Sequence, residues 1–380
     1  MSEWKTIPAD VFCDSVRDGT HDTPKQVEKG YKLVTAKHIN NGQIDLSDAY
    51  LISEQDYLKI NERSKVEQWD VLMSMIGNGL GKSAVVKNTP EYAIKNLALF
   101  KLGNEIKAKW LHYYLSSKAG QGFIFNSLQG SGQPFISLSL LRKFPIPVPN
   151  DETIMGDVVT VLSRYDSLIE NYQKQIKLLE EAAQRLYKEW FVDLHFPGHE
   201  STKIVDGVPE GWLKTNINNM LTFHRGYDLT HKEFIDGPYP VVGSTSIIGC
   251  HNKYKIVGPG IITGRSGSLG VYQLIWENYW PHNTSLYISD FKGHDVSYIY
   301  CMLKTVDFTT LNSGGAIPSL NRNTLSNILL VEPPKDLQQF FSEKAIPLLK
   351  EQKSLQSQIR LLTEARDRLL PKLMSGEITV

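Results

Sequence analysis

The feature that most constrains this chain is a long amphipathic helix pattern that occurs twice. From Asp151 to Asp193, apolar residues recur at alternating steps of three and four, which is the spacing of one face of a helix. Gly156 is the only glycine in this stretch, and proline is absent from it. At a rise of about 1.5 Å per residue, the pattern predicts a rod of roughly 60 Å. One apolar face on so long a helix requires a second helix to cover it.

The second copy of the pattern supplies that partner. It occupies residues 335–374, and its segment QIRLLTEARDRL (358–369) matches QIKLLEEAAQRL (175–186) almost residue for residue. The segments that lead into the two helices, GSGQPFISLSLLRKFPIPVP and GGAIPSLNRNTLSNILLVEP, also correspond. Two unrelated amphipathic helices would explain the apolar spacing but not these shared leading segments. The sequence therefore predicts two copies of one module, each a globular part followed by a long helix.

Each globular part contains short apolar runs separated by turn residues, together with one helical segment. We therefore predict an α+β protein with two similar domains, mixed and partly barrel-like sheets, and an internal pseudo-two-fold repeat. Each long helix is expected to cover the apolar face of the other. Pro347 lies within the second helix pattern and is expected to kink that helix or to mark a late start. The predicted segments are a first domain at 1–150, a central helix at 151–194, a linker at 195–211, a second domain at 212–334 and a C-terminal helix at 335–376.

The two domains have corresponding predicted elements. In the first domain, strands are expected at 31–35, 50–52, 71–76, 84–86 and 97–102, with a helix at about 109–117. In the second domain, strands are expected at 239–242, 260–263, 271–275 and 284–289, with a helix near 296–303.

The charge distribution permits nucleic-acid binding without demonstrating it. The chain has 41 basic and 41 acidic residues, so its formal net charge is zero. Residues 151–200 hold 5 Lys and Arg against 10 Asp and Glu, whereas residues 1–150 hold 18 against 15. Acidic charge thus collects on the first helix and leaves the globular parts neutral to mildly basic, which allows a local basic face.

Composition argues against several other classes of protein. Cys13, Cys250 and Cys301 are scattered, with no CxxC pair and no spacing that suits zinc, so we expect free thiols and no structural metal. The N-terminal residues lack the pattern of a signal peptide, and no run approaches 18 apolar residues. We expect a cytoplasmic protein that does not contact a membrane.

The glycine-rich segment Gly77–Ser83 superficially resembles a phosphate-binding loop. A Walker A loop has four residues between its first glycine and the Gly-Lys pair, and this segment has three. It also resembles the S-adenosylmethionine loop of methyltransferases, but their catalytic Asn/Asp-Pro-Pro-aromatic tetrapeptide is absent. Neither a nucleophile elbow nor an HExxH motif occurs in the sequence. We therefore expect no catalytic residues and no metal ligands.

The repeat favours a different interpretation of these glycines. The apolar run 70–74 leads into a glycine-rich loop with Lys82, as the run 260–263 leads into one with Arg265. Backbone amides beside a cation suit a phosphodiester, and a plain hairpin turn is the alternative. The polar tracts at Asp18 and at Arg225 also correspond; they carry side chains of the kind that read base edges, and ordinary surface loops are the alternative. The candidate DNA-contacting residues are Asp18, Gly19, Thr20, His21, Thr23, Lys37, Asn78, Gly79, Lys82, Gln133, Arg225, Gly226, Tyr227, Arg265, Gly267, Ser268, Asn283 and Asn312.

Three stretches resemble the specificity (S) subunit of type I restriction-modification systems. They are the C-terminal 362–378 (LTEARDRLLPKLMSGEI), the central 186–193 (LYKEWFVD) and the tetrad Asp18-Gly19-Thr20-His21 followed by Thr23-Pro24. The second domain lacks the tetrad, as expected if each target-recognition domain reads a different half of the site.

The resemblance implies a function. Each domain would bind one half of a bipartite, asymmetric site in double-stranded DNA. The two long helices would pack antiparallel as a coiled coil between the domains and set the spacing of the half-sites. They would also dock two DNA methyltransferase (M) subunits, which restriction/translocase (R) subunits would join. The chain itself would be non-catalytic and would bind no cofactor, with S-adenosylmethionine, ATP and magnesium on the partner subunits. Two alternatives stay open at this stage: a coiled-coil adaptor whose modules bind proteins, and a self-sufficient nuclease or methyltransferase.

Overall fold

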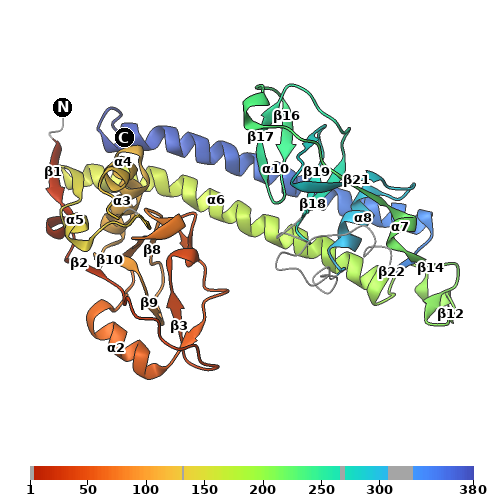
Figure 1. Cartoon of the computed structure of the whole chain (residues 1–380), viewed down its shortest axis with the longest axis horizontal. Helices are drawn as coiled ribbons and strands as arrows, with labels where there is room; N and C mark the ends of the chain where they lie inside the picture. Colours follow the sequence, from red (N-terminus) through yellow and green to blue (C-terminus); the bar gives the residue numbers. More distant parts are fainter. Residues whose placement is uncertain (1–3, 131, 266–269, 307–327) are drawn as a thin grey trace. The chain divides into compact units, whose positions relative to one another are not determined.

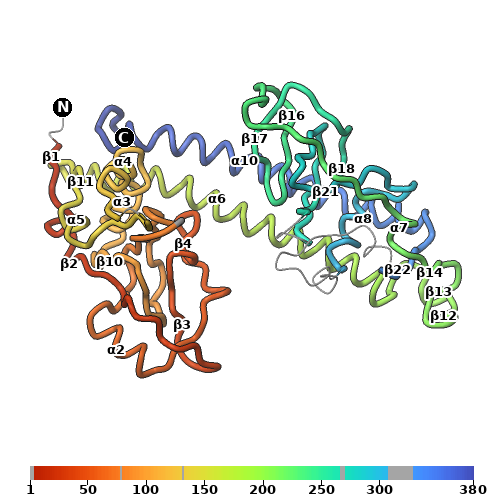
Figure 2. Tube along the Cα trace, viewed as in Figure 1, coloured from red at the N-terminus to blue at the C-terminus, as the bar shows by residue number. Residues whose placement is uncertain are grey.

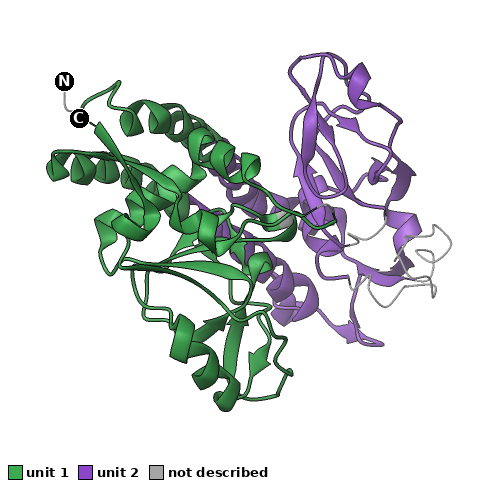
Figure 3. Cartoon of the chain, turned by 60° about the vertical axis from the view of Figure 1, so that its left-hand side comes forward, with its two compact units in different colours: residues 1–171, 358–380 green, residues 172–357 purple. Residues whose placement is uncertain are grey.

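The chain forms two compact units (Figure 3). The computed structural model describes residues 4–130, 132–265, 270–306 and 328–380. Unit 1 consists of residues 1–171 and 358–380, and unit 2 of residues 172–357. Each unit therefore contains one of the two globular parts and a section of both long helices.

The two long helices are α6 (Glu152–Tyr187), which continues into the π-helical turn η3 (Lys188–Val192), and α10 (Lys335–Met374). Within each unit their sections run antiparallel (Figure 1). In unit 1 the start of α6 meets the end of α10, and the Asp166 carboxylate accepts a hydrogen bond from Arg366 Nη1 at 2.8 Å. In unit 2 the end of α6 meets the start of α10, and the ring centroids of Tyr187 and Phe341 lie 5.8 Å apart.

The late start predicted at Pro347 is wrong, because α10 begins at Lys335 and stays helical through the proline. A proline removes one backbone hydrogen bond from a helix. Ala345 and Leu349 are buried on either side of it, so their packing holds the helix across the missing bond.

The apolar face predicted for α6 is right in unit 2 and displaced by one residue in part of unit 1. The apolar spacing in the sequence predicted a buried face that includes Leu168, Ala183 and Trp190. Ala183 and Trp190 are buried, whereas Leu168 is 44% exposed and its neighbour Ile169 is buried. The reason is that α10 is not the only element covering α6 in unit 1. The hydroxyl of Tyr113, on α3 (Glu105–Ser116), donates to Asp166 at 2.5 Å, so a second surface helps to decide which residues are buried.

Unit 1 contains a two-stranded, a four-stranded and a three-stranded sheet with the orders β1-β11, β2-β10-β7-β8 and β6-β3-β9. All pairings are antiparallel except that of β3 with β9, which is parallel. A parallel bridge from Thr20, just after β2, to Lys95, just after β9, joins the two larger sheets. The strands are β1 (Trp4–Pro8), β2 (Ser15–Asp18), β3 (Tyr31–Val34), β6 (Leu51–Ile52), β7 (Val71–Ser74), β8 (Ser83–Val85), β9 (Tyr92–Ile94), β10 (Leu97–Lys101) and β11 (Pro145–Pro149), with the small pair β4 (Ile39–Asn40) and β5 (Gln43–Ile44).

Helices cover these sheets and close the core of unit 1. Trp110 of α3 is fully buried and stacks on Trp4 of β1, at a centroid distance of 5.8 Å. Figure 2 shows both chain ends in this unit, where Trp4 contacts Gly376 just after α10. The other helices are α1 (Ala9–Phe12), α2 (Glu54–Ser64), α4 (Lys118–Asn126) and α5 (Leu138–Arg142), with the 3-10 turns η1 (Ala36–His38) and η2 (Gly77–Gly79).

Unit 2 repeats the strand order of the three sheets of unit 1, without an equivalent of the pair β4–β5 among its described residues. Its sheets have the orders β14-β22, β15-β21-β18-β19 and β17-β16-β20, and β16 pairs with β20 in parallel as β3 does with β9. The strands are β14 (Leu213–Asn216), β15 (Thr222–Arg225), β16 (Tyr239–Val242), β17 (Ile247–His251), β18 (Gly260–Gly264), β19 (Tyr272–Ile275), β20 (Trp280–Pro281), β21 (Ser285–Asp290) and β22 (Leu329–Glu332). Among the residues of unit 2 that the structure describes, the shorter helical elements are α7 (Ile217–Met220) and α8 (Val296–Leu303), with the turns η4 (His199–Ser201) and η5 (His231–Glu233).

The predicted α+β fold class and internal repeat are confirmed, and most predicted strands lie within two residues of the observed ones. The run 71–76 ends as a strand at Ser74, because the glycine-rich turn η2 begins at Gly77. The linker 195–211 contains an unpredicted hairpin of β12 (Ile204–Val205) and β13 (Val208–Pro209). Helix α2 was also missed, since its sequence is mostly polar, with Tyr57, Leu58 and Ile60 as its large apolar residues.

Candidate nucleic-acid interface

The loops that follow β2, β9 and β3 lie side by side in unit 1. Thr20 forms a parallel bridge with Lys95, and the Lys95 N–H donates to the Val34 carbonyl at 2.9 Å, so the residues after these strands form a row. The row continues through Ala36, whose carbonyl oxygen lies 3.4 Å from the position a Cβ would take on Gly79. We call the residues 18–23, 35–40, 77–82 and 95–96 the unit 1 loop edge. It gathers most of the candidate residues of the first domain.

Gly19 begins this edge, and its lack of a side chain serves packing between strands. Gly19 is buried, and a Cβ added to it would overlap the carbonyl oxygen of Ile94. Gly226 occupies the equivalent place in unit 2, where a Cβ would overlap the carbonyl oxygen of His282. The repeat therefore requires glycine at both positions for close approach of backbone to backbone.

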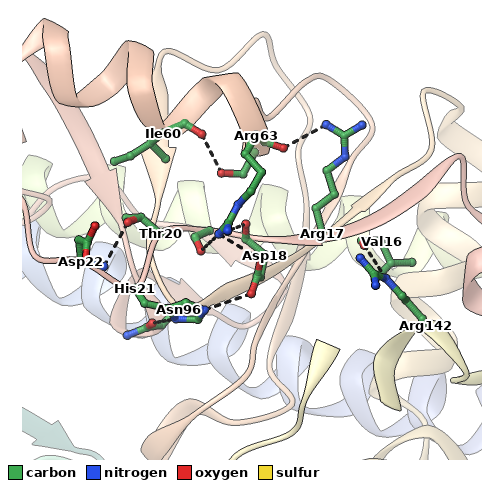
Figure 4. A network of polar contacts seen from close by, with 12 residues as sticks. Val16, Arg17, Asp18, Thr20, His21, Asp22, Ile60, Arg63, Asn96 and Arg142 are labelled. Carbon is green, nitrogen blue, oxygen red and sulfur yellow. Dashed lines mark hydrogen bonds and ion pairs between the residues drawn. The ribbon is translucent and has the colours of Figure 1, made fainter. Parts of the chain in front are cut away.

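The His21 ring is held by two neighbours of the same edge (Figure 4). Its Nδ1 lies 2.8 Å from Asn96 Oδ1, and its Nε2 lies 3.1 Å from Asp18 Oδ2. The side chain is nevertheless 65% exposed. Both ring nitrogens are engaged within the loop, so the ring offers a ligand its face and carbon edge. Direct reading of a base by a His21 nitrogen would require these contacts to break.

Thr20 and Thr23 are also tied into the loop. The Thr20 Oγ1 accepts a hydrogen bond from the Asp22 N–H at 3.1 Å, and the Thr23 hydroxyl pairs with the Lys95 ammonium. The Thr20 hydroxyl retains its own proton as a donor, which suits the N7 or O6 acceptors of a base.

The glycine-rich turn contributes a cation to the same edge. Lys82 is exposed, and its Nζ donates to Asn40 Oδ1 at 3.2 Å. Gln133 is exposed beside Gly77, and Asn78 lies within η2. Lys37 forms an exposed ion pair with Asp48 at 2.9 Å. The hydrogen bond from Lys37 lowers the pKa of the Asp48 carboxyl, and the pair offsets part of the positive charge of Lys37.

Unit 2 gathers its candidate residues in the same way. Tyr227 forms a parallel bridge with His282, and the His282 N–H donates to the Val242 carbonyl at 2.9 Å, as in the row of unit 1. The Arg265 N–H donates to the Thr284 carbonyl at 3.2 Å. We call the residues 225–228, 243–246, 265 and 282–284 the unit 2 loop edge. Gly267, Ser268 and Asn312 lie outside the described residues.

The side chains of this second edge differ from those of the first. Arg225 Nη2 lies 3.6 Å from Asp228 Oδ1, to which Asn283 also donates. The Tyr227 hydroxyl lies 3.0 Å from that of Tyr287. The pKa of Tyr287 is raised, mainly because of burial and secondly because of its contact with Tyr227. An acid at position 18 of the first edge is thus replaced by a base at the equivalent Arg225, and Thr20 is replaced by Tyr227.

Sequence reasoning missed three polar residues of the unit 1 loop edge, Asn40, Lys95 and Asn96, and also Arg63, which contacts this edge. For Asn96 a signal was present. It follows the strand equivalent to the one before Asn283, which was selected, so the repeat alone pointed to it. Arg63 lies on α2 and approaches Gly19 only through the tertiary fold.

The described residues include two buried cysteines, Cys13 and Cys301, and His112 beside Ser83. They contain no group of three or more His, Cys, Asp or Glu that could hold a metal ion. Burial raises the thiol pKa of Cys13 and of Cys301 to about 12, so neither forms a thiolate readily. His112 accepts or donates a hydrogen bond with the Ser83 hydroxyl at 2.9 Å, and burial lowers its pKa to about 4. That value makes it a weak general base near neutral pH.

The fold and its two loop edges define a duplicated recognition protein built on a pair of long helices. A family model described as the type I restriction modification DNA specificity domain matches residues 1–181 and 209–355. The chain therefore belongs to the type I restriction-modification DNA specificity family, and the resemblance noted in the sequence is confirmed.

Individual relatives agree with this assignment. The chain is 26% identical over 331 residues to the type I restriction enzyme MjaIX specificity subunit of Methanocaldococcus jannaschii, covering 79% of this chain and 76% of the relative. It is 22% identical to the HindI specificity subunit of Haemophilus influenzae, covering 90% and 94%. A crystal structure of the type I restriction-modification S subunit from M. genitalium has the same fold, with a TM-score of 0.59, 16% identity and coverage of 98% and 96%. Among the described residues, no helix is long and apolar enough to cross a membrane.

Proposed function

We propose that this chain is the DNA-sequence-specifying subunit of a type I restriction-modification complex and that each loop edge binds one half of a split, asymmetric DNA site. The observation that carries the proposal is the equivalence of the two edges. They share strand order, parallel bridge and buried glycine, yet they present Asp18 and Thr20 in one unit and Arg225 and Tyr227 in the other. A common scaffold with different side chains at equivalent positions suits two domains that read different sequences.

The chemistry of each loop edge supports two kinds of contact, one to the phosphates of the DNA backbone and one to the edges of the bases. Lys82 and Arg265 are exposed cations beside glycine-rich turns, which suits phosphate contacts. Thr20 and Asn283 carry hydroxyl and amide groups that discriminate base edges in the major groove. The remaining residues of the candidate set stay predictions of the same kind.

We further propose that the long helices set the spacing of the half-sites and dock two methyltransferase subunits. Two leucines at the same position of the repeat support two equivalent docking sites. Leu178 of α6 is 63% exposed and Leu361 of α10 is 56% exposed, although both lie on apolar-rich helices. S-adenosylmethionine would be held by those subunits, and ATP with magnesium by restriction/translocase subunits, so the chain itself would do no chemistry.

A binding experiment with the complex of this chain and its methyltransferase subunits tests the proposal. The methylome of the host would provide the split motif, and duplexes would then carry changes in one half, in the other, or in the spacer. We expect a loss of affinity for a change in either half and none for a change in spacer sequence. Binding that ignores sequence would refute the proposal, and it would turn attention to an adaptor whose modules bind proteins. Methylation or cleavage by this chain alone would contradict the non-catalytic role.

A further inference from the structure

Arg63, at the end of α2, contacts the loop that follows β2 in the unit 1 loop edge (Figure 4). Its Nη2 lies 2.9 Å from the carbonyl oxygen of Gly19 and 3.2 Å from Asp18 Oδ1. The end of α2 is itself held to β2, because Arg17 Nη1 donates to the Arg63 carbonyl at 3.0 Å. Asp18 in turn fixes the His21 ring, so the guanidinium holds both the backbone and the side chains of this loop.

Unit 2 places a cation against the equivalent loop from the equivalent connection. Arg63 lies between β6 and β7, and Lys255 lies between β17 and β18, which are the corresponding strands. The Lys255 Nζ lies 5.3 Å from the ring centroid of Tyr227 and 4.9 Å from that of Trp280. Its backbone N–H donates to the Tyr279 carbonyl at 3.0 Å, which anchors the connection.

The two contacts differ in chemistry but agree in what they hold. In unit 1 the loop offers an acid and a carbonyl oxygen, and the cation is an arginine that donates hydrogen bonds. In unit 2 the loop offers an aromatic face, and the cation is a lysine above it. The connections themselves are unlike, since only the first contains a helix. The sequence repeat does not itself require a cation in this connection. The presence of a cation in both units therefore points to a shared requirement.

We propose that Arg63 and Lys255 are positioning residues. Each would hold one loop, the loop after β2 in unit 1 or the loop after β15 in unit 2, in the conformation that contacts DNA. This inference rests on the proposed function. Each loop is held by its strand bridge, to Lys95 or His282, and in addition by the cation. Arg63 is 62% exposed, so its ion pair with Asp18 adds little to global stability. Its removal is expected to loosen the loop and to leave the fold intact.

The test measures how well the assembled complex discriminates its cognate duplex from duplexes altered in one half-site. Loss of the hydrogen bonds of a charged group predicts that Arg63→Ala lowers discrimination at one half-site by about ten-fold. Loss of an exposed cation–π contact predicts a decrease of about three-fold for Lys255→Ala, at the other half-site. Arg63→Lys, which keeps the charge but not the planar donor pair, should lie between wild type and Arg63→Ala.

Arg142→Ala is the matched control. Arg142 also donates to a carbonyl of β2, that of Val16 at 3.3 Å, but it does not touch the loop. It should leave discrimination at both half-sites unchanged. If Arg63→Ala lowers the melting temperature of the complex, Arg63→Lys provides the measurement, with the same half-site affected.

Three outcomes would overturn the inference. One is unchanged discrimination in both the Arg63 and Lys255 variants. Another is an equal loss at both half-sites from either variant. The third is unchanged discrimination together with a weaker salt dependence of binding. If the slope of log affinity against log salt fell in magnitude by about 0.9, the cation would be a simple phosphate contact. A wild-type complex that does not discriminate either half-site would instead refute the proposed function, so the two failures are distinguishable.

Discussion

Leu178 and Leu361 allow the docking proposal to be tested quantitatively. They occupy the same position of the repeated helix sequence, and 63% and 56% of their surfaces are exposed. Complete burial of a leucine side chain contributes about 1.5–3 kcal/mol, so a partner that covers the exposed part gains roughly 1–2 kcal/mol from each. Leu178→Ala or Leu361→Ala should therefore weaken one methyltransferase docking site by about 5- to 30-fold.

The assay is a titration of this chain with the methyltransferase subunit, followed by native mass spectrometry and sedimentation. Each single variant should weaken one of two binding steps, so that complexes with one methyltransferase subunit accumulate at intermediate concentrations. The double variant should weaken both steps. Leu58→Ala is the matched control, because Leu58 is 57% exposed but lies on α2. Unchanged binding in the double variant, or an effect equal to that of the control, would refute the reasoning.

Three further predictions concern the fold and the modular organisation. Gly19→Ala should destabilise unit 1 by about 2 kcal/mol or more in urea unfolding, because its Cβ would overlap a backbone oxygen, whereas Gly122→Ala, with open space in α4, should be neutral or stabilising. Burial lowers the pKa of His112 from 6.5 to about 4, so the unfolded state binds more protons between these pH values. The contribution of His112 to the free energy of unfolding should therefore be complete above pH 6.5 and decrease as the pH approaches 4. His112→Asn should flatten this dependence, and an unaltered slope would assign it to other groups. Exchanging residues 1–150 for those of a relative should change one half-site in the methylome, and a change in both halves would contradict the modular organisation.

Much of the architecture follows from local patterns that the sequence displays directly. The long helices were predictable because apolar residues every three or four positions can be buried only on one helical face. The strand β16 and the helix α8 were predicted with their observed bounds, since each is a compact apolar segment between turn residues. The duplication was also readable, because corresponding segments keep the same residues in the same order.

The composition of the loop edges could not be read from local sequence patterns, because it depends on the tertiary fold. Thr20 is far in sequence from the adjacent residues Lys95 and Asn96, and it meets them only because β2 and β9 end side by side. The displacement of the buried face from Leu168 to Ile169 likewise comes from α3, which no periodicity within α6 could reveal.

The sequence by itself therefore determined the repeat, the two helices and the family. Only the tertiary structure decided that the His21 nitrogens are occupied, that Gly19 and Gly226 serve packing, and that Arg63 and Lys255 approach equivalent loops. The physical reason is the range of the interactions. Helix periodicity and turn chemistry act between residues a few positions apart, whereas a recognition loop is shaped by contacts between segments that the chain brings together from a distance.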